Sequence, residues 1–238
     1  MSTTPARRIE RVRHELKRRH LKVKAVETLT PHFRRITFTD DSLGDFVSAA
    51  FDDHIKVFMA DARRDYTPRS FDNAARELVI EFALHGEGPA AEWAAQAAAG
   101  DTLDIGGPKG SMIVPLDYDW HLLVGDETAF PAVARRLEEL PPGAKAIVIL
   151  QSADIADRRE FKTAANVSLT WVATDAGLLA AVRALALPAG DGYAWCAGEA
   201  ACMAALRREL VDVKGHPGEA IRAAAYWKRG ARGHHENL

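Results

Sequence analysis

The sequence predicts two domains, an antiparallel β-domain followed by an α/β domain built on a parallel sheet. Before about residue 118, β-branched and aromatic residues alternate with polar ones in short segments between turn-forming clusters, which is typical of strands. From Trp120 onward, nearly continuous apolar segments alternate with helical ones. This second pattern is typical of a parallel sheet covered on both faces, whose ligands bind at the carboxyl ends of the strands.

Composition limits the possible classes of function. The 238 residues are 47% hydrophobic and 27% charged, which suits a globular protein with two domains of ordinary size. No apolar run approaches the ~20 residues of a membrane-spanning helix, and the arginine-rich start has no apolar signal core. We therefore expect a cytoplasmic protein without membrane insertion. The net charge of -2 gives no electrostatic basis for nucleic-acid binding, and Cys196 and Cys202 form no CxxC pattern.

Residues 1–20 are predicted to be a basic N-terminal arm or a first helix, residues 21–118 the β-domain and residues 119–238 the α/β domain. Basic side chains dominate the start of the chain: Arg7, Arg8, Arg11, Arg13, Lys17, Arg18, Arg19, Lys22 and Lys24. A solvated basic face is the simpler explanation of this charge. The alternative is that the segment attracts an anionic substrate or partner.

The expected elements follow from the same patterns. In the β-domain, strands are expected at residues 22–29, 33–40, 54–61, 76–85 and 101–106, with one alanine-rich helix at 88–100. In the α/β domain, strands are expected at 121–127, 144–151, 167–174 and 193–198, and helices at 128–140, 178–185 and 199–210.

The segment Arg64-Asp65-Tyr66-Thr67-Pro68-Arg69-Ser70 is the sharpest local signal for a binding site. Successive side chains of a strand point to opposite faces, so Tyr66 and Thr67 offer an aromatic ring and a hydroxyl from adjacent positions. The flanking arginines suit phosphate groups. A surface strand with cation–π contacts is the more common explanation of such residues, and this segment alone leaves both interpretations open.

A second candidate is the turn from His85 to Pro89 with the helix start that follows it, Ala90-Ala91-Glu92-Trp93. Unpaired N–H groups at a helix N-terminus bind a pyrophosphate without a basic side chain. The alternative is a plain strand-to-helix turn with Trp93 in the core. The turn Gly106-Gly107-Pro108-Lys109-Gly110-Ser111 is compatible with a simple strand connection and decides nothing alone.

Two junctions in the second half, Val124–Pro131 and Cys196–Ala200, stand where an apolar strand passes into a helix. Such junctions at the carboxyl edge of a parallel sheet are where a dinucleotide lies. Neither contains GxGxxG, and a P-loop is absent from the sequence, so a standard Rossmann fingerprint is excluded.

In combination, these segments resemble the siderophore-interacting proteins, flavoreductases of the ferredoxin-reductase superfamily. The segments RDYTPR, HGEGPAAEWA, GGPKGS, LLVGDETAFPA, AWCAGEA and AAYWKRG occur in the family's order and spacing between about Leu21 and Gly230. The resemblance implies an antiparallel β-barrel that binds FAD, followed by an α/β domain that binds NADPH or NADH. It implies an FAD-dependent NAD(P)H:ferric-siderophore oxidoreductase.

The resemblance also implies roles for individual residues. Tyr66 and Thr67 would contact the flavin, with Thr67 near its redox-active nitrogen, and Lys56 would act beside them as the third catalytic residue. The FAD site as a whole would comprise Arg64, Tyr66, Thr67, Arg69, His85, Gly86, Pro89, Ala90, Ala91, Trp93, Gly107, Lys109, Gly110 and Ser111. The nicotinamide site would comprise Asp126, Glu127, Thr128, Ala129, Gly198 and Glu199.

The substrate that the resemblance implies is a ferric siderophore, an anionic iron chelate. Lys56, Lys228 and Arg229 would dock it, since a small cationic patch attracts such chelates without a closed pocket. Lys56 as a strand lysine that only reaches toward water is the alternative. Iron is here the substrate, and we expect no resident metal, because the adjacent His234 and His235 lack further ligands.

Two departures from the family pattern bear on the cofactors. Ala91 stands near a position where the family commonly has serine, so the pyrophosphate would depend more on backbone N–H groups. After the strand 144–151, Asp154 favours NADH while Arg158 and Arg159 favour NADPH, and the resemblance favours NADPH. Reduced ferredoxin remains an alternative donor.

Other functions stay open at this level. A general NAD(P)H diaphorase of the same superfamily would reduce unrelated acceptors equally well and would not need Lys56. A non-catalytic flavin or siderophore carrier would have lost nicotinamide binding, against which the intact GDETAFPA and CAGEA segments argue.

Overall fold

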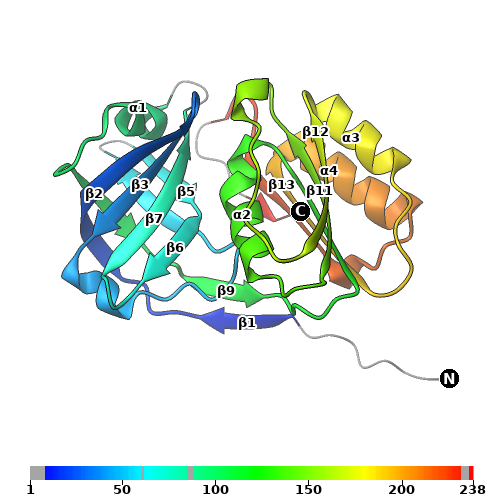
Figure 1. Ribbon diagram of the computed structural model, residues 1–238, viewed down its shortest axis with the longest axis horizontal. Coiled ribbons are helices and arrows are strands. Elements are labelled where there is room, and N and C mark those ends of the chain that lie inside the picture. The colour runs from blue at the N-terminus through cyan, green and yellow to red at the C-terminus, as the bar shows by residue number, and fades with distance from the viewer. Residues whose placement is uncertain (1–8, 60–61, 85–87, 232–235, 238) are drawn as a thin grey trace.

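The computed structural model describes residues 9–59, 62–84, 88–231 and 236–237. Figure 1 shows a sheet half built from the first part of the chain beside a second half in which helices cover both faces of a sheet. The predicted fold class, an antiparallel β-barrel followed by an α/β domain with a parallel sheet, is confirmed. Within the described residues, no helix is long and apolar enough to cross a membrane.

The first half is a seven-stranded antiparallel sheet in the order β5-β4-β8-β2-β3-β7-β6. Its strands are β2 (Arg18–Thr30), β3 (Phe33–Thr39), β4 (Ile55–Met59), β5 (Ala62–Tyr66), β6 (Pro68–Asp72), β7 (Glu77–Ala83) and β8 (Thr102–Gly106). The two edge strands, β5 and β6, are consecutive in the chain and are joined by Thr67 alone. The sheet must therefore curl until its edges meet, which makes it a barrel.

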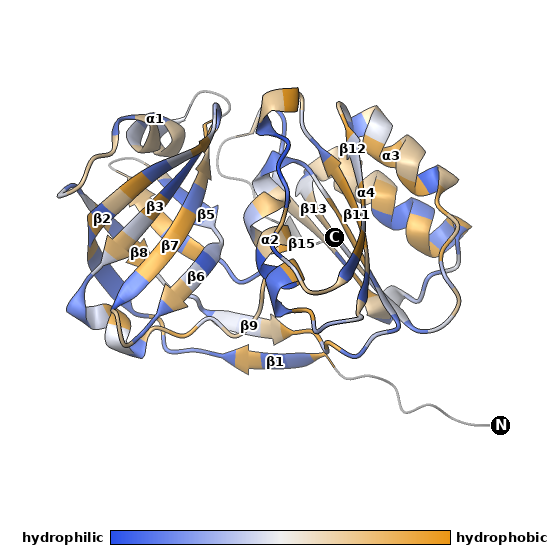
Figure 2. Ribbon diagram, in the orientation of Figure 1, coloured by the Kyte–Doolittle hydropathy of each residue, from blue (hydrophilic) through white to orange (hydrophobic). Residues whose placement is uncertain are grey.

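Alternating burial shows why these segments form a barrel. The buried residues Leu21, Val23, Ile36 and Phe38 of β2 and β3 point inward, and exposed or half-buried residues separate them. Figure 2 shows the resulting mixture of hydrophobic and hydrophilic residues along these strands. The helix α1 (Pro89–Gln96) lies over one end of the barrel, and the short helix η1 (Asp41–Asp45) follows β3.

The second half has a parallel sheet in the order β12-β11-β10-β13-β14, extended by β15 (Glu236–Asn237), which is antiparallel to β14. The parallel strands are β10 (Trp120–Gly125), β11 (Lys145–Gln151), β12 (Asn166–Val172), β13 (Gly192–Glu199) and β14 (Ile221–Trp227). The helix α2 (Phe130–Glu139) lies between this sheet and the barrel, whereas α3 (Asp175–Ala184) and α4 (Ala200–Arg208) cover the opposite face (Figure 1). Short η-helices fill the connections: η2 (Glu127–Ala129), η3 (Ile155–Asp157), η4 (Glu209–Val213) and η5 (Gly218–Ala220).

The basic N-terminal segment forms strands, so the expected first helix is wrong for its described part. Strand β1 (Glu10–Arg13) pairs antiparallel with β9 (Gly110–Ile113). Strand β2 begins at Arg18, three residues before the expected start of the β-domain, because Arg19 is buried and pairs with Asp45 at 2.7 Å. Tertiary pairing, rather than local helix propensity, decides the conformation here.

Alternation of polar and apolar residues does not identify several of the strands. Strands β5 and β6 include the charged residues Arg63, Arg64, Asp65 and Arg69, and β14 has three consecutive alanines. They pair with β4, β7 and β13, and alternation of polarity along each segment is weak, so the local pattern does not identify them as strands. The helix α1 also ends at Gln96 rather than at Gly100.

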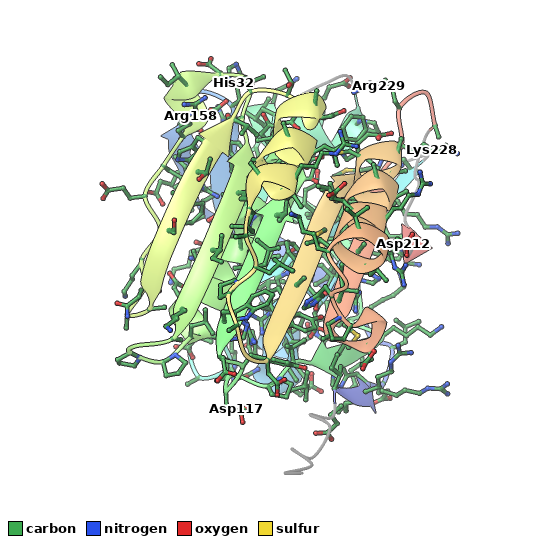
Figure 3. The ribbon with its side chains drawn as sticks, turned by 90° about the vertical axis from the view of Figure 1, so that its right-hand side faces the viewer. His32, Asp117, Arg158, Asp212, Lys228 and Arg229 are labelled. Atoms are coloured by element: carbon green, nitrogen blue, oxygen red, sulfur yellow. The ribbon has the colours of Figure 1, made fainter. Side chains whose placement is uncertain are left out.

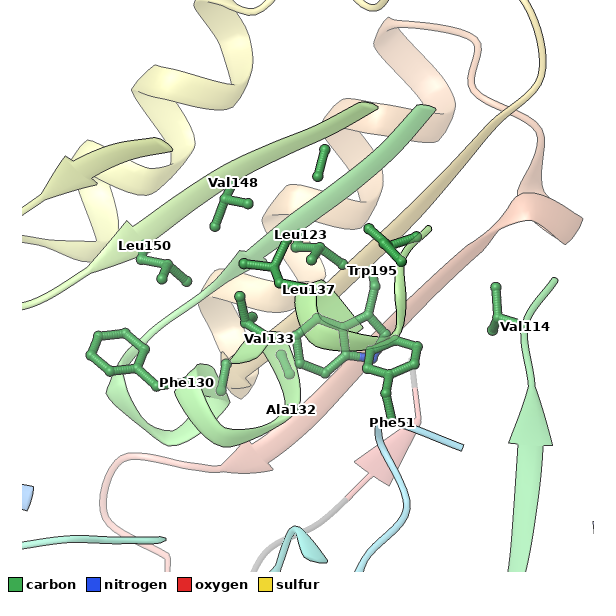
Figure 4. Close-up of a cluster of buried hydrophobic side chains, with 14 of the residues drawn as sticks. Phe51, Val114, Leu123, Phe130, Ala132, Val133, Leu137, Val148, Leu150 and Trp195 are labelled. Carbon is green, nitrogen blue, oxygen red and sulfur yellow. The ribbon is translucent and has the colours of Figure 1, made fainter. Parts of the chain in front are cut away.

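One hydrophobic cluster crosses the join between the two halves. Phe51, from the loop before β4, packs edge-on against Trp195 of β13 with ring centroids 5.4 Å apart. Phe33 of β3 stacks on Phe130 of α2 at 5.4 Å. Figure 4 shows Phe51 and Trp195 beside Val133 and Leu137 of α2. The two halves therefore share a core, which fixes their relative position.

Replacement of Gly110 by alanine is expected to destabilise the fold through β1. A Cβ atom at Gly110 would lie 2.5 Å from the Val12 carbonyl oxygen, so β1 must move away from β9. We expect Gly110→Ala to lower the free energy of unfolding by about 1–3 kcal/mol, the usual cost of overpacking. Urea unfolding measures the change, and Gly44→Ala, with no heavy atom within 4 Å of its Cβ, is the matched control. Equal losses in both variants would contradict the close approach of β1.

Candidate functional site

The predicted binding segment lies where the barrel meets the second half. Tyr66 ends β5 half-buried, its ring 4.5 Å from that of Phe82, and burial raises the pKa of its hydroxyl. Thr67 is buried in the connection to β6, and its side chain lies near the hydroxyl of Tyr226 on β14. Arg64 is half-buried on β5 and donates to the Arg63 carbonyl at 3.0 Å. The structure thus brings Thr67 directly against the parallel-sheet half.

Arg69 is held by carboxylates rather than left free for a phosphate. Its guanidinium donates to both oxygens of Glu138 on α2, at 2.8 and 2.7 Å, and lies 3.4 Å from Glu81. Only 8% of Arg69 is exposed, so the group is committed to this contact. Its predicted contact with FAD stays a prediction.

The start of α1 is open in the way that phosphate binding needs. Gly88 is the N-cap residue, it forms no side-chain cap hydrogen bond, and Pro89 occupies the first turn. Among the described residues, the N–H groups at this helix start, including those of Ala90 and Ala91, have no capping side chain. The predicted site residues His85 and Gly86 lie outside the described residues. Trp93 packs on Phe38 at 6.2 Å between ring centroids, so it supports the helix from beneath.

The turn 107–111 is largely engaged in internal contacts. Gly107 has φ 95°, the peptide bond to Pro108 is cis, and the exposed Lys109 accepts the His14 N–H through its carbonyl at 3.0 Å. Ser111 is buried, donates to Asp53 at 2.6 Å and accepts the Ala49 N–H at 3.1 Å. Gly110 and Ser111 thus hold β1 and the loop before β4, and their direct contact with a flavin stays a prediction.

Asp126, at the carboxyl end of β10, accepts hydrogen bonds from three neighbouring segments of the chain. Its carboxylate accepts the Thr128 N–H and hydroxyl on one oxygen, and the Glu199 N–H and Trp227 indole N–H on the other, at 2.5–3.0 Å. Gly198 lies against the same carboxylate with φ 151°, a conformation that favours glycine. Burial raises the pKa of Asp126 to about 6. The predicted nucleotide residues Asp126, Thr128, Gly198 and Glu199 are therefore brought together, held by this carboxylate.

The remaining residues of this edge have defined neighbours. Glu127 accepts the Ala153 N–H at 2.9 Å, and Ala129 is fully buried at the start of α2. Glu199 caps α4 by accepting the N–H groups of Ala201 and Cys202 at 2.7 and 3.0 Å. This capping leaves the N-terminus of α4 with a negative neighbour, so it is a poor site for an anion.

Lys228 and Arg229 line a cavity of about 720 Å³ between the first turns of α3 and α4. Arg229 pairs with Asp175 at 3.2 Å, and its N–H lies 3.3 Å from Glu199. Figure 3 shows both basic residues at the end of the sheet opposite Asp117, which is the carboxyl end of the strands. The structure therefore groups them with the predicted nucleotide residues.

Lys56 lies elsewhere, on β4, where its ammonium group is 2.7 Å from one oxygen of Asp65. It remains 42% exposed, so it can still face an approaching solute. Arg159, a candidate for a 2′-phosphate, instead donates to Glu81 of the barrel at 2.6 Å. The sequence order could not show these pairings, because Lys56 and Asp65 lie on different strands and Arg159 reaches Glu81 from a loop of the other half.

His32, Asp154 and Asp157 form a group that offers ligand atoms within 4.8 Å of one another. The imidazole Nδ1 lies 2.7 Å from Asp157, whose other oxygen accepts the Thr30 hydroxyl at 2.7 Å. These contacts satisfy the buried Asp157 carboxylate and tie the β2–β3 turn to η3. We interpret the group as a hydrogen-bonded contact across the join.

Sequence reasoning missed the side chains of the second half that reach the binding segment: Arg135 and Glu138 of α2, and Tyr226 of β14. The run Arg135–Glu139 has the composition of a solvated helix face, which hides its buried contacts. Tyr226 lies in the segment AAYWKRG, whose pattern carried no local indication of a contact with Thr67.

Comparison with known proteins follows the same division of the chain. Residues 118–230 match the model of the siderophore-interacting proteins, and residues 22–64 and 60–112 match that of the siderophore-interacting FAD-binding domain. The chain belongs to the siderophore-interacting protein family. The open start of α1 and the hydroxyl, aromatic and basic groups of the segment 64–67 fit the FAD that this family's barrel binds.

Relatives and solved structures agree with this membership. The NADPH-dependent ferric-chelate reductase of Escherichia coli (strain K12) is 35% identical over 256 residues, which cover 95% of this chain and 99% of the relative. Ferric vibriobactin reductase ViuB of Vibrio cholerae serotype O1 is 31% identical over 227 residues, covering 82% and 84%.

Among solved structures, a siderophore utilization protein from T. fusca has a TM-score of 0.86 and 33% identity, covering 96% of this chain and 98% of the other. The siderophore-interacting protein SipS from Aeromonas hydrophila has a TM-score of 0.80 and 30% identity, covering 90% and 92%.

The stability of this siderophore-interacting protein is expected to depend on pH through Asp126. Its folded-state pKa of about 6 lies above its ordinary value of 3.8, so the folded protein binds more protons between these pH values. The Asp126 contribution to the free energy of unfolding therefore falls as pH rises through this range. We expect Asp126→Asn to remove this contribution, as measured by urea unfolding at pH 4, 5, 6 and 7. Parallel pH profiles of variant and wild type would contradict a raised pKa.

Proposed function

We propose that this protein is an FAD-dependent oxidoreductase that uses NADPH to reduce ferric siderophores and release Fe(II), with NADH as the alternative donor. One observation supports this most directly. The flavin segment of the barrel lies against the second half, where Thr67 contacts Tyr226 of β14, close in sequence to the residues that line the carboxyl edge of the parallel sheet. A flavin and a nicotinamide bound to these two elements would meet at the join.

Different residues of the barrel would bind different parts of FAD. Arg64, Tyr66 and Thr67 would hold its flavin end, and the N–H groups of Ala90 and Ala91 at the open start of α1 would bind its pyrophosphate. Bound FAD supplies the conversion of a two-electron donor into single electrons. The protein side chains orient the reactants and need no paired carboxylates or nucleophile for this reaction.

The nucleotide would lie along the carboxyl edge of the parallel sheet. Asp126 holds Gly198 and Glu199 in place, and Glu127 to Ala129 form the neighbouring turn. The cavity beside Lys228 and Arg229 provides cationic side chains next to this edge. Asp175 and Glu199 also line this cavity, so we keep Lys228 and Arg229 as proposed docking residues for the siderophore.

Iron enters as substrate. One NADPH and two Fe(III) chelates give NADP⁺, one proton and two Fe(II). Oxygen-rich chelators hold the larger, less charged Fe(II) more weakly, so reduction releases the metal. Lys56 would attract the anionic chelate to the barrel, since its side chain stays partly exposed beside Asp65.

Three finer points remain part of the proposal. We propose cytoplasmic action, because NADPH is supplied there, and we keep reduced ferredoxin as an alternative electron donor. We also propose a division at residues 118 and 119, supported by the start of β10 at Trp120 and by the ranges of the two family models. Of the proposed arm, residues 18–20 belong to barrel strand β2, whereas β1 pairs with β9 in a separate two-stranded sheet.

Anaerobic spectrophotometry tests the reaction. The oxidised-flavin absorbance of the purified protein should bleach when NADPH is added and should return when a ferric siderophore and a ferrous trap follow. Protein that does not bind added FAD would overturn the assignment. Bound flavin that no nicotinamide bleaches would point to ferredoxin as donor or to a carrier, and equal rates with unrelated acceptors would favour a diaphorase.

Lys56→Ala should slow the iron step by up to about tenfold at low salt, because long-range attraction of an anionic chelate is lost. The difference should shrink as ionic strength rises. Stopped-flow mixing of reduced protein with a ferric siderophore measures this rate, and bleaching by NADPH should be unchanged. Lys24→Ala is the control, since Lys24 is an exposed barrel lysine that pairs with Glu77. Identical rates for both variants and wild type would remove Lys56 from docking.

A further inference from the structure

Three consecutive residues of the segment Arg64–Ser70, namely Thr67, Pro68 and Arg69, contact side chains of the other half of the protein. The side chain of Thr67 lies near the hydroxyl of Tyr226 of β14. The Pro68 carbonyl accepts a hydrogen bond from Arg135 of α2 at 3.1 Å. Arg69 forms the bidentate pair with Glu138 of α2. The position of these three residues, which connect β5 to β6 and begin β6, therefore depends partly on side chains outside the barrel.

These contacts are strong because water is largely excluded from them. Arg69 and Arg135 are each 8% exposed, and Arg135 also donates to the Ser48 carbonyl and hydroxyl at 2.8 and 2.7 Å. Two parallel charge-assisted bonds fix the direction of Arg69 as well as its distance. The bonds from Arg69 also hold the pKa of the Glu138 carboxyl below its ordinary value, so this partner stays charged.

The helix α2 connects these contacts to the nucleotide edge. It begins at Phe130, directly after the turn Asp126–Ala129, and Glu138 follows about 12 Å further along at the usual rise of a helix. Tyr226 is likewise close to that edge, because its neighbour Trp227 donates to Asp126 at 2.7 Å. The helix α2 thus starts at the proposed nicotinamide site, and the strand β14 ends there.

We propose that Glu138, Arg135 and Tyr226 are positioning residues for the flavin, so that tight binding of FAD by the barrel requires α2 and β14 of the other half. This inference rests on the proposed role of Thr67 and its neighbours in binding FAD. The three side chains act through the segment 67–69 and need not touch the flavin.

The main test is the affinity of the apoprotein for FAD, measured by flavin fluorescence. Glu138→Gln keeps the shape of the side chain but removes its charge, and we expect the dissociation constant for FAD to rise about tenfold, a usual size for coupling between sites. Amide hydrogen exchange in the apoprotein should become faster in the segment 67–72. The control is Glu209→Gln, because Glu209 pairs with Arg183 within the second half at 3.2 Å. It should leave both quantities unchanged.

Two further variants separate positioning from general stability. Glu138→Asp, which keeps the negative charge beside Arg69, should retain more of the affinity for FAD than Glu138→Gln does. Tyr226→Phe removes one hydroxyl but keeps the ring against Trp195, and it should shift the visible spectrum of the bound flavin. Lower melting temperatures with FAD affinity, spectrum and exchange as in the wild type would overturn the proposal. Absence of FAD binding by the wild type itself would instead overturn the proposed function.

Discussion

Two buried arginines of α2 hold the barrel and the parallel sheet together, and the site at the join depends on them. Arg135 donates to Ser48 and to the Pro68 carbonyl, and Arg136 donates to the Val114 and Pro115 carbonyls at 3.2 and 2.8 Å. A guanidinium taken out of water needs acceptors at fixed positions. Because these acceptors lie in the first half of the chain and in the segment that follows β9, the two arginines help to define how the halves dock. The shared apolar core around Phe51 and Trp195 fills the space between them.

A buried carboxylate of the first half, that of Asp52, also holds the two halves together. Asp52, in the loop before β4, accepts the Trp195 indole N–H at 3.0 Å and pairs with Arg222 of β14 at 2.9 Å. Arg222, Ala224 and Tyr226 alternate along β14, so one face of this strand meets the barrel. The strand that carries Tyr226 is therefore positioned by a charge pair at one end and an aromatic contact at the other.

This arrangement suits electron transfer between two bound cofactors and an external iron chelate. The barrel supplies a hydroxyl, an aromatic ring and an open helix start, and the parallel sheet supplies a strand edge braced by Asp126. Since neither half holds all of these groups, the proposed reaction would take place at the join. Rigid docking is then more important than a closed pocket, because the iron substrate stays outside in its chelator.

Much of the fold follows from the sequence. The alternation along β2 and β3 and the apolar runs of β10, β11 and β13 determine a β-barrel followed by a parallel sheet, because the period of burial is local in the chain. The family segments likewise indicate FAD and a nicotinamide. Only the tertiary structure decided the strands β1, β5, β6 and β14, the pairing of Arg69 with Glu138, and the contact of Tyr226 with Thr67. Strands β5 and β6 pair with the neighbouring strands β4 and β7, but their charged residues hide the alternation of a strand. The other contacts join residues far apart in the sequence, and a local pattern carries no information about which distant partner satisfies a buried charge.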